Sequence, residues 1–475
     1  MDFFKDAFLI ILPSYLSRAL QGRTAPSPKL TPTSSLNGLR GIAAVIVLLF
    51  HTIWAYSITV DLGYGYMGQN LSILQLPFLR IVHAGHAMVC IFFVVGGYVI
   101  SLKPLRLMRQ DRWDDLFKTV SSSLMRRGVR LYMPPLVATL VTAMTVHMGW
   151  WESGRANIAA NRELFYYVDY QPVRQPTFLS QLDDWRSRVT PLFNLWGPQG
   201  YFGEYDPHLW TVPQEFRCSV LVTLALVAFA PFRTSCRWLF MFALIVYAAA
   251  WTRWEAVLFL AGAWLAEIDM VTNARSEKEG GDAANILVRW ADETGNGSTI
   301  RLYSMLHRKM KTVAPPVIFL LGLYLMSCPP VAFHAAPGYA WLSSLIPENF
   351  QGEDRKRFIH GAGAIITVWA VCNSSTIQRP FLTRFAQYLG EISYSLYIVH
   401  GPFVHMISYA ITPAIWRYFG TETTTKWAAG CFLGNLFTFV IIFWVADLFW
   451  RMVDTRSVEF SRLLEKLCVQ TGSEK

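Results

Sequence analysis

Long blocks of apolar residues, separated by polar stretches, recur along the whole chain. Blocks such as GIAAVIVLLFHTIWAYSITV and FLGNLFTFVIIFWVADLFW are close to the roughly 20 residues that a helix needs to cross a hydrocarbon core. Lipid offers no hydrogen-bonding partners to the backbone, so such blocks are expected to form helices. The pattern therefore predicts an all-α fold, a polytopic transmembrane bundle of about ten spans. The predicted spans lie near 39–60, 86–103, 131–150, 212–231, 237–252, 254–270, 314–328, 359–374, 387–409 and 427–449.

The chain contains no internal repeat and no low-complexity tract, which indicates one membrane domain over residues 36–450. Within it, the polar stretch 271–312 is predicted to be a cytosolic loop. Residues 1–35 form an N-terminal segment whose apolar run is broken by Pro13, typical of an interfacial amphipathic helix rather than a cleavable signal peptide. Residues 451–475 form a C-terminal tail.

Composition supports a membrane protein. Of 475 residues, 53% are hydrophobic and only 16% are charged, whereas soluble proteins carry roughly 25% charged residues. The net charge of +10 lies mostly in loops beside apolar blocks. Positive-inside topology explains such a distribution, so no nucleic-acid partner is expected. The seven cysteines show no CxxC pattern, which predicts packing roles and no metal site.

Lysine and arginine positions predict the orientation. The strongest basic cluster lies between the second and third spans, which places that loop and both termini in the cytosol. We expect the membrane to be an endomembrane, such as the endoplasmic reticulum. One loop opposes this topology, because Arg355, Lys356 and Arg357 fall on the outer side.

Of three Asn-x-Ser sequons, only the one at Asn70 falls in a predicted lumenal loop, so Asn70 is the candidate glycosylation site. The longest lumenal segment, 151–207, forms either a lid over the bundle or simple connections.

Ionisable residues inside spans are costly and usually face a polar interior. Arg40 and His51 lie in the first span with ten residues between them, which separates them by about 16 Å along a helix. Glu215 in the fourth span and His400 in the ninth are predicted at a depth comparable to that of His51. A histidine is a suitable general base, and a nearby carboxylate can orient it and stabilise its charge. This predicts His51, Glu215 and His400 as catalytic residues.

The alternative is that each of these three is a buried polar residue with a structural hydrogen bond. The other histidines lie near span ends and are predicted to be structural, with His86 intermediate.

The basic segment 103–130 has two interpretations. It either sets the topology and contacts anionic lipid, or its positive charge binds the phosphates of a coenzyme. The run RRGVRLYMPP places Arg126, Arg127 and Arg130 at the mouth of the third span. Arg126 and Arg130 are spaced i, i+4 and can share a helix face.

Five strings, in order, resemble those of the membrane-bound acyltransferase family 3. LNGLRGIAAVIVLLFH resembles its first span, with an arginine, ten residues and a histidine. IFFVVGGYVIS, RRGVRLYMPP, LWTVPQEF and LGEISYSLYIVHGP resemble its second span, its arginine-rich start of span three, its LWSL-x-VE element and its late SYSLYLxH element. Three positions differ from the family's usual residues. Gly96 replaces the serine that is common in the second string, and Gln214 and Phe216 replace the residues that commonly flank the acidic residue. The residues around Glu215 resemble those of members from filamentous fungi, which often act on secondary metabolites.

The resemblance implies a ten-helix bundle that transfers an acyl group, commonly acetyl, from a coenzyme A thioester to a hydroxyl. It implies that His51 accepts a proton and that Arg40 serves the coenzyme or the site's architecture. We expect Arg126, Arg127 and Arg130 to contribute to coenzyme binding, and Tyr394 and Tyr397 to line the acceptor pocket. Acyl-CoA is then a cosubstrate, and no permanently bound cofactor is expected. Partners are acyl-CoA, a lipophilic hydroxylated small molecule and the bilayer.

Two other classes of function are open at this stage. A transporter of a small molecule or acyl group is one, because helices broken near mid-depth mark many transporters and Pro213 lies in the fourth span. A catalytically silent membrane scaffold is the other, but it leaves the spaced Arg40 and His51 unexplained.

Overall fold

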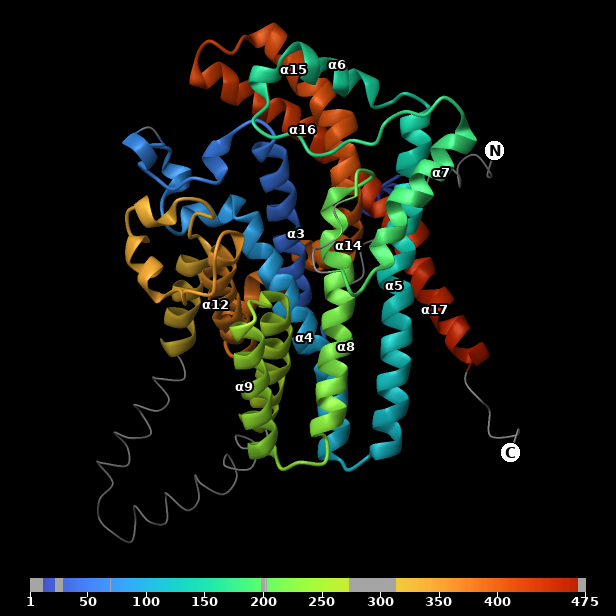
Figure 1. Cartoon of the computed structure of the whole chain (residues 1–475), viewed down its shortest axis with the longest axis vertical. Coiled ribbons are helices and arrows are strands. Elements are labelled where there is room, and N and C mark those ends of the chain that lie inside the picture. Colours follow the sequence, from blue (N-terminus) through green and yellow to red (C-terminus); the bar gives the residue numbers. More distant parts are fainter. Residues whose placement is uncertain are drawn as a thin grey trace.

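The computed structural model describes residues 12–21, 29–68, 70–197, 201, 203–272 and 313–468. Within these ranges every regular element is helical, so the predicted all-α class is confirmed. In Figure 1, α5 and α8 run along the long axis, and α6 and α15 lie across the upper end. The longer helices are α3 (Ser34–Trp54), α4 (Gly85–Arg109), α5 (Trp113–His147), α8 (Thr211–Phe229), α9 (Thr234–Ala250), a helix over 254–272, Val313–Met326, α12 (Glu353–Cys372), α14 (Arg384–Phe403) and α16 (Thr424–Phe449). The shorter ones are α2 (Ser14–Leu20), α6 (Glu152–Ala160), α7 (Phe178–Val189), α13 (Ser375–Gln378), α15 (Tyr409–Phe419) and α17 (Thr455–Cys468).

The polytopic bundle is confirmed, whereas the number of spans is lower by the criteria of length and composition. Each of the ten predicted segments overlaps a helix. Among the described residues, six helices are long and apolar enough to cross a membrane, or seven if the bent pair Glu353–Cys372 and Ser375–Leu382 counts as one span. Thr234–Ala250 and Val313–Met326 are shorter apolar helices.

Paired charges set α9 and its neighbour apart from the simple spans. Arg237 on α9 contacts Glu267 on the 254–272 helix with an N–O distance of 2.7 Å, and both side chains are buried. Removing either charge would leave the other buried without a counter-ion, which is costly in a low-dielectric interior. The two helices therefore pack as a charge-paired hairpin.

Small residues bring α3 and α14 into close contact. A Cβ added to Gly41 would lie 2.4 Å from the backbone nitrogen of Gly390, and one added to Gly390 would lie 2.5 Å from the backbone oxygen of Asn37. Backbones approach this closely in membrane helices only where small residues form the crossing. This crossing brings the His51 end of α3 toward the His400 end of α14.

The segment 151–207, for which the sequence left a lid or simple connections open, folds over one end of the bundle. It contains α6, which packs against α15, and α7, which packs against α5. Asn157 on α6 donates to the backbone oxygen of Tyr409 at 3.1 Å. The described part of the segment is thus a cap on the bundle, and it contributes polar residues to the site described below.

The two ends of the domain are also anchored. In the N-terminal segment, Ser14 at the start of α2 donates from its backbone nitrogen and its hydroxyl to Asp447 of α16, at 3.0 and 2.6 Å. In the tail, α17 packs along α5. The predicted polar loop 271–312 lies almost wholly outside the described residues, as do residues 1–11 and 22–28 of the predicted interfacial segment.

The helix break predicted at Pro213 is wrong. Pro213 lies in the first turn of α8, which continues to Phe229. A proline in the first turn removes no intrahelical hydrogen bond, because the backbone N–H groups there have no partner within the helix. The argument for a transporter from a mid-depth break therefore falls away.

Candidate functional site

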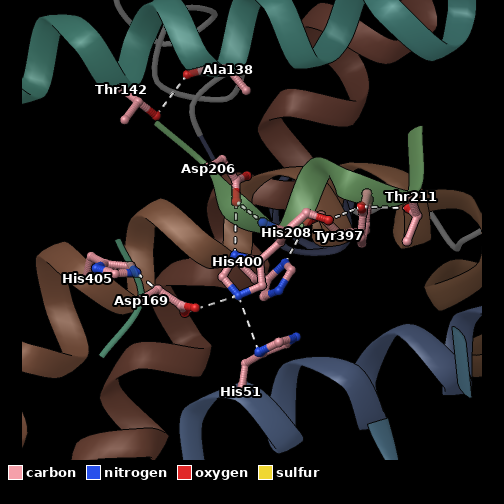
Figure 2. Close-up of polar contacts among 10 residues, drawn as sticks. All are labelled: His51, Ala138, Thr142, Asp169, Asp206, His208, Thr211, Tyr397, His400 and His405. Carbon is pink, nitrogen blue, oxygen red and sulfur yellow. Dashed lines mark hydrogen bonds and ion pairs between the residues drawn. The ribbon is translucent and has the colours of Figure 1, made fainter. Parts of the chain in front are cut away.

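Three histidines from distant parts of the chain meet inside the bundle (Figure 2). His51 lies on α3, His400 on α14, and His208 on the helical turn η7 (Pro207–Trp210) that leads into α8. Their ring centroids are 4.2 Å apart for His51 and His208, 4.6 Å for His208 and His400, and 5.2 Å for His51 and His400. His208 and His400 are buried, and His51 is partly exposed.

A hydrogen-bonded chain links His51 to a buried carboxylate. Asp206 Oδ1 lies 2.9 Å from His208 Nδ1, and His208 Nε2 lies 3.2 Å from His51 Nδ1. An ionised carboxylate only accepts hydrogen bonds, so His208 Nδ1 carries a proton. With His208 neutral, its Nε2 accepts from His51 Nδ1–H, and the lone pair of neutral His51 lies on Nε2. The network thus assigns His51 the tautomer of a general base.

Local contacts hold these hydrogen-bonded residues in position. Asp206 caps η7 by accepting from the backbone nitrogen of His208 at 3.0 Å. The hydroxyl of Tyr397 contacts Thr211 Oγ1 at 2.7 Å and donates to the backbone oxygen of His208. Gly401 leaves the necessary room, since a Cβ there would lie 2.5 Å from His208 Nδ1 and 2.8 Å from Asp206 Oδ1.

His400 is held differently. Its Nδ1 donates to the backbone oxygen of Tyr397 at 2.6 Å. Its Nε2 is buried and has no hydrogen-bond partner among the described residues. His400 therefore presents an unused acceptor toward the other two imidazoles.

A second carboxylate lies beside the histidines. Asp169 Oδ2, from the 151–207 segment, is 3.5 Å from His208 Nε2 and 3.8 Å from His405 Nε2. His405 lies on a π-helical turn, Val404–Ser408, and stacks on Trp151 at 5.2 Å. Burial raises the pKa of Asp169, but the neighbouring imidazoles of His208 and His405 outweigh it, so the pKa lies below its usual range. Asp169 thus supplies negative charge next to the imidazoles.

Two cavities lie in this part of the bundle, and His51 and His208 line one of them. The histidine cavity contains His51, His208 and Asp169, with aromatic walls that include Trp54 and Tyr167. Those two rings stack at 3.9 Å, and Arg357 lies 4.6 Å from the centroid of Trp254, another wall residue. The arginine cavity shares the wall residues Val47 and Val89 with it and is otherwise lined by charged, tyrosine and apolar side chains. The polar residues of the arginine cavity are Arg40, Arg127, Arg130, Thr211, Glu215, Ser393, Tyr394 and Tyr397.

The predicted arginines have distinct partners. Arg127 pairs with Glu215 at 2.6 Å, and Arg130 lies 3.7 Å from Asp454. Arg126 contacts Glu465 on α17 at 3.3 Å and does not line the arginine cavity. Arg40 forms no hydrogen bond or ion pair with any residue that the structure describes, although it lines the cavity. Arg40 is therefore the cation most available to an anionic ligand.

The structure separates two residues that the sequence analysis had grouped. Glu215 lies in the arginine cavity against Arg127, whereas the hydrogen-bonding contact of His51 is with His208. The residue that contacts His51 is thus His208, which contacts Asp206 in turn, and not Glu215. His208 and His405 are predicted from the sequence to be structural, and Asp169 and Asp206 are not among the predicted site residues. The available signal was Asp206-Pro207-His208, two polar residues around a proline directly before an apolar span.

Tyr394 and Tyr397 do line a cavity, but it is the arginine cavity. The Tyr394 hydroxyl donates to the backbone oxygen of Leu131 at 2.8 Å. Both hydroxyls are thus engaged in joining α14 to α5 and to η7. Each ring still contributes wall surface.

The geometry at Asn70 disfavours glycosylation in the folded protein. Asn70 is 7% exposed, and its Nδ2 donates to the backbone oxygens of Leu62 and Gly63 at 3.3 and 3.0 Å. A glycan is attached to this nitrogen, so its attachment would displace both bonds. The prediction of a glycan at Asn70 has no support from this environment.

Comparison with known proteins finds a family and several relatives. The chain matches the sequence model of an acyltransferase domain over residues 33–446. It is 28% identical to the O-acetyltransferase PaAT-1 of Phomopsis amygdali, over 98% of this chain and 90% of that protein. It is 23% identical to Acyltransferase R4 of Phoma sp., over 89% of this chain and 93% of that protein. Acyltransferase clz18 of Cochliobolus lunatus is 22% identical, over 90% of this chain and 95% of that protein. No solved structure matches the chain.

Proposed function

Because the chain belongs to the acyltransferase family whose sequence model covers residues 33–446, we propose that it is an O-acyltransferase acting on a small lipophilic hydroxylated molecule. The donor is acyl-CoA, and acetyl-CoA in particular, since one relative is named an O-acetyltransferase. The acceptor is a secondary metabolite. The observation that carries the proposal is the placement of His51, which has a carboxylate-linked imidazole on one ring nitrogen and lies on a cavity wall.

The arginine cavity suits the donor. Its apolar wall residues, among them Phe92 and Phe93, match an acyl chain and the thioether arm of the coenzyme. Arg40 also lines a polar groove at the start of α3 that includes Lys29, Thr31 and Ser34. Cations and hydroxyls along one groove suit phosphates. The coenzyme phosphates thus lie along this groove, near Arg40, rather than on Arg126, which is committed to Glu465.

The histidine cavity suits the acceptor. Lipophilic ligands bind in concave sites with many aromatic side chains and a few directional polar groups. Here Trp54, Tyr167 and Trp210 form wall surface, and His51 is the polar group for a hydroxyl. Donor and acceptor then approach the shared wall at Val47 and Val89 from different cavities. In the proposed topology the donor enters from the cytosolic side of an endoplasmic-reticulum membrane, with both termini cytosolic.

In the reaction, His51 Nε2 takes the proton of the acceptor hydroxyl as the oxygen attacks the thioester carbonyl carbon. The new C–O bond forms, the C–S bond breaks, and the coenzyme leaves as a thiolate that receives the proton from His51. Positive charge that develops on His51 is shared with His208 through the Nδ1–Nε2 hydrogen bond and is stabilised by Asp206 and Asp169. This is the logic of a carboxylate–histidine pair, extended by one imidazole.

The direct test is transfer of label from radiolabelled acetyl-CoA to a pool of hydroxylated lipophilic metabolites by the purified full chain in detergent. We expect labelled ester and free coenzyme in equal amounts. Hydrolysis of acetyl-CoA without ester would contradict the acceptor assignment. Uptake of a metabolite into vesicles without any need for coenzyme, together with no ester, would replace the proposal with a transporter.

The relay predicts a specific sensitivity at Asp206. In Asp206→Asn the side chain keeps its size, but it loses the charge that holds the proton on His208 Nδ1. We expect kcat to fall by about 10- to 1,000-fold with the donor KM little changed, because a wrongly oriented imidazole impairs proton transfer more than binding. Asp183→Asn, at an exposed position on α7, is the matched control. Equal turnover in Asp206→Asn and wild type would exclude the relay.

A further inference from the structure

The three histidines also have the arrangement of a metal site. One ring nitrogen from each of His51, His208 and His400 lies within 4.8 Å of the others. Zinc bonds to histidine nitrogen at about 2.0–2.1 Å, so two ligands of a tetrahedral ion lie about 3.3 Å apart. The 3.2 Å between His51 Nδ1 and His208 Nε2 is already close to that separation. His400 needs to approach by about 1.5 Å to complete a three-histidine set.

The other ring nitrogens of two of these histidines are already fixed. Histidines that bind metals usually donate their second N–H to a carboxylate or a backbone carbonyl, which fixes the tautomer. His208 Nδ1 contacts Asp206, and His400 Nδ1 donates to the Tyr397 backbone oxygen. Both therefore direct an Nε2 lone pair toward the common centre. His400 Nε2 is the clearer signal, because it is buried in a residue 1% exposed and has no partner among the described residues.

The carboxylates beside the three histidines also favour the binding of a cation. Three neutral imidazoles leave a divalent ion with its full charge, which is costly to bury. Asp169 Oδ2 lies 3.5 Å from His208 Nε2, and Asp206 binds the opposite side of the same ring. Two carboxylates thus offset the ion's charge. Neutral imidazole ligands favour zinc, copper and nickel over magnesium and calcium, which prefer oxygen.

We propose that His51, His208 and His400 bind one zinc-like divalent ion, and that its binding switches off the base. The ion takes the lone pair of His51 Nδ1, so the ring's remaining proton moves to Nε2. His51 Nε2 then donates a hydrogen bond and cannot accept the proton of a hydroxyl. Inhibition rests on the proposed acyltransferase function, whereas ion binding does not.

Binding is measured first, without donor or acceptor. The full chain, purified in detergent and stripped with EDTA, is exposed to zinc, desalted and assayed for bound metal by mass spectrometry. We expect one equivalent of zinc in wild type, resistance to excess magnesium, and affinity weakened by at least about tenfold in His400→Gln. His334→Gln, an exposed histidine on the turn Phe333–Ala335, is the matched control. Wild-type affinity in His400→Gln, or no stoichiometric uptake, would overturn the site.

Two further measurements keep the test decisive. If His400→Gln does not fold, the visible spectrum of cobalt bound to wild type reports nitrogen coordination, and a spectrum of hexaaquo cobalt alone would overturn the site. Once ester formation is established, zinc should abolish it and EDTA should restore it. Zinc that binds and accelerates transfer would overturn the inhibitory role, because the ion would then be part of the catalyst. Absence of any ester formation leaves the binding result valid by itself.

Discussion

His51→Gln should lose almost all acyl transfer while remaining folded. Glutamine keeps the polarity and approximate size of the side chain, but it cannot take a proton at neutral pH. General-base catalysis contributes about 10²- to 10⁴-fold, so we expect kcat to fall by that factor. The donor KM should change little, because His51 does not line the arginine cavity. Initial rates of ester formation at saturating acetyl-CoA measure the effect.

The matched control for this prediction is His334→Gln, which changes an exposed histidine far from the cluster in sequence. It should retain wild-type turnover. Elution as a single species on size exclusion, with an unchanged melting temperature, establishes that His51→Gln is folded. Turnover within a few-fold of wild type would show that the base lies elsewhere, and His400, with its unused Nε2, would be the next residue to test.

Gly97→Ala should prevent stable folding of the bundle. A Cβ at Gly97 of α4 would lie 2.0 Å from the backbone oxygen of Phe259, and one at Gly262 would lie 2.1 Å from the backbone oxygen of Val94. The two backbones are therefore in contact at reciprocal glycines. A backbone atom cannot rotate away from an added methyl group as the end of a flexible side chain can, so the two helices must separate. We expect destabilisation of about 3 kcal/mol or more, at the upper end of overpacking costs.

Gly128→Ala on α5 is the matched control, because it makes the same chemical change in another long helix. Its Cβ would lie 3.4 Å from the Phe216 ring, an ordinary van der Waals contact. Alanine has a higher helix propensity than glycine, so this variant should melt at or above the wild-type temperature. Thermal melting in detergent, followed by tryptophan fluorescence, compares the two. Equal melting of Gly97→Ala and wild type would show that α4 and the 254–272 helix cross farther apart than the structure has them.

Much of the site could be predicted from single residues, but their pairing could not. Arg40, His51, Glu215 and His400 stood out because charge and imidazole are expensive inside apolar helices. Equal depth predicts proximity, which holds for His51 and His400 but not for the contact expected between His51 and Glu215. Depth along a helix does not specify which face a side chain occupies. Glu215 faces Arg127, and this partner is 88 residues away in the chain.

His208, Asp206 and Asp169 escaped prediction for a different reason. They lie on a short turn and in a polar connecting segment, where histidine and aspartate are ordinary surface residues. Only the folding of their segments against α3 and α14 brings them together with His51 and His400. Nothing in their local sequence indicates burial, except that Asp206 and His208 directly precede an apolar helix.

The sequence by itself determined the all-α bundle, the approximate helix positions and the family, because apolar blocks of membrane length and five ordered strings are local properties of the chain. The tertiary structure alone decided which charges meet. Close approach at Gly41 and Gly390 brings His51 toward His400, and the room left at Gly401 admits Asp206 and His208. It also decided that α9 and its neighbour carry a buried ion pair. Contacts of this kind depend on helix rotation and crossing distance, which arise only when distant segments pack together.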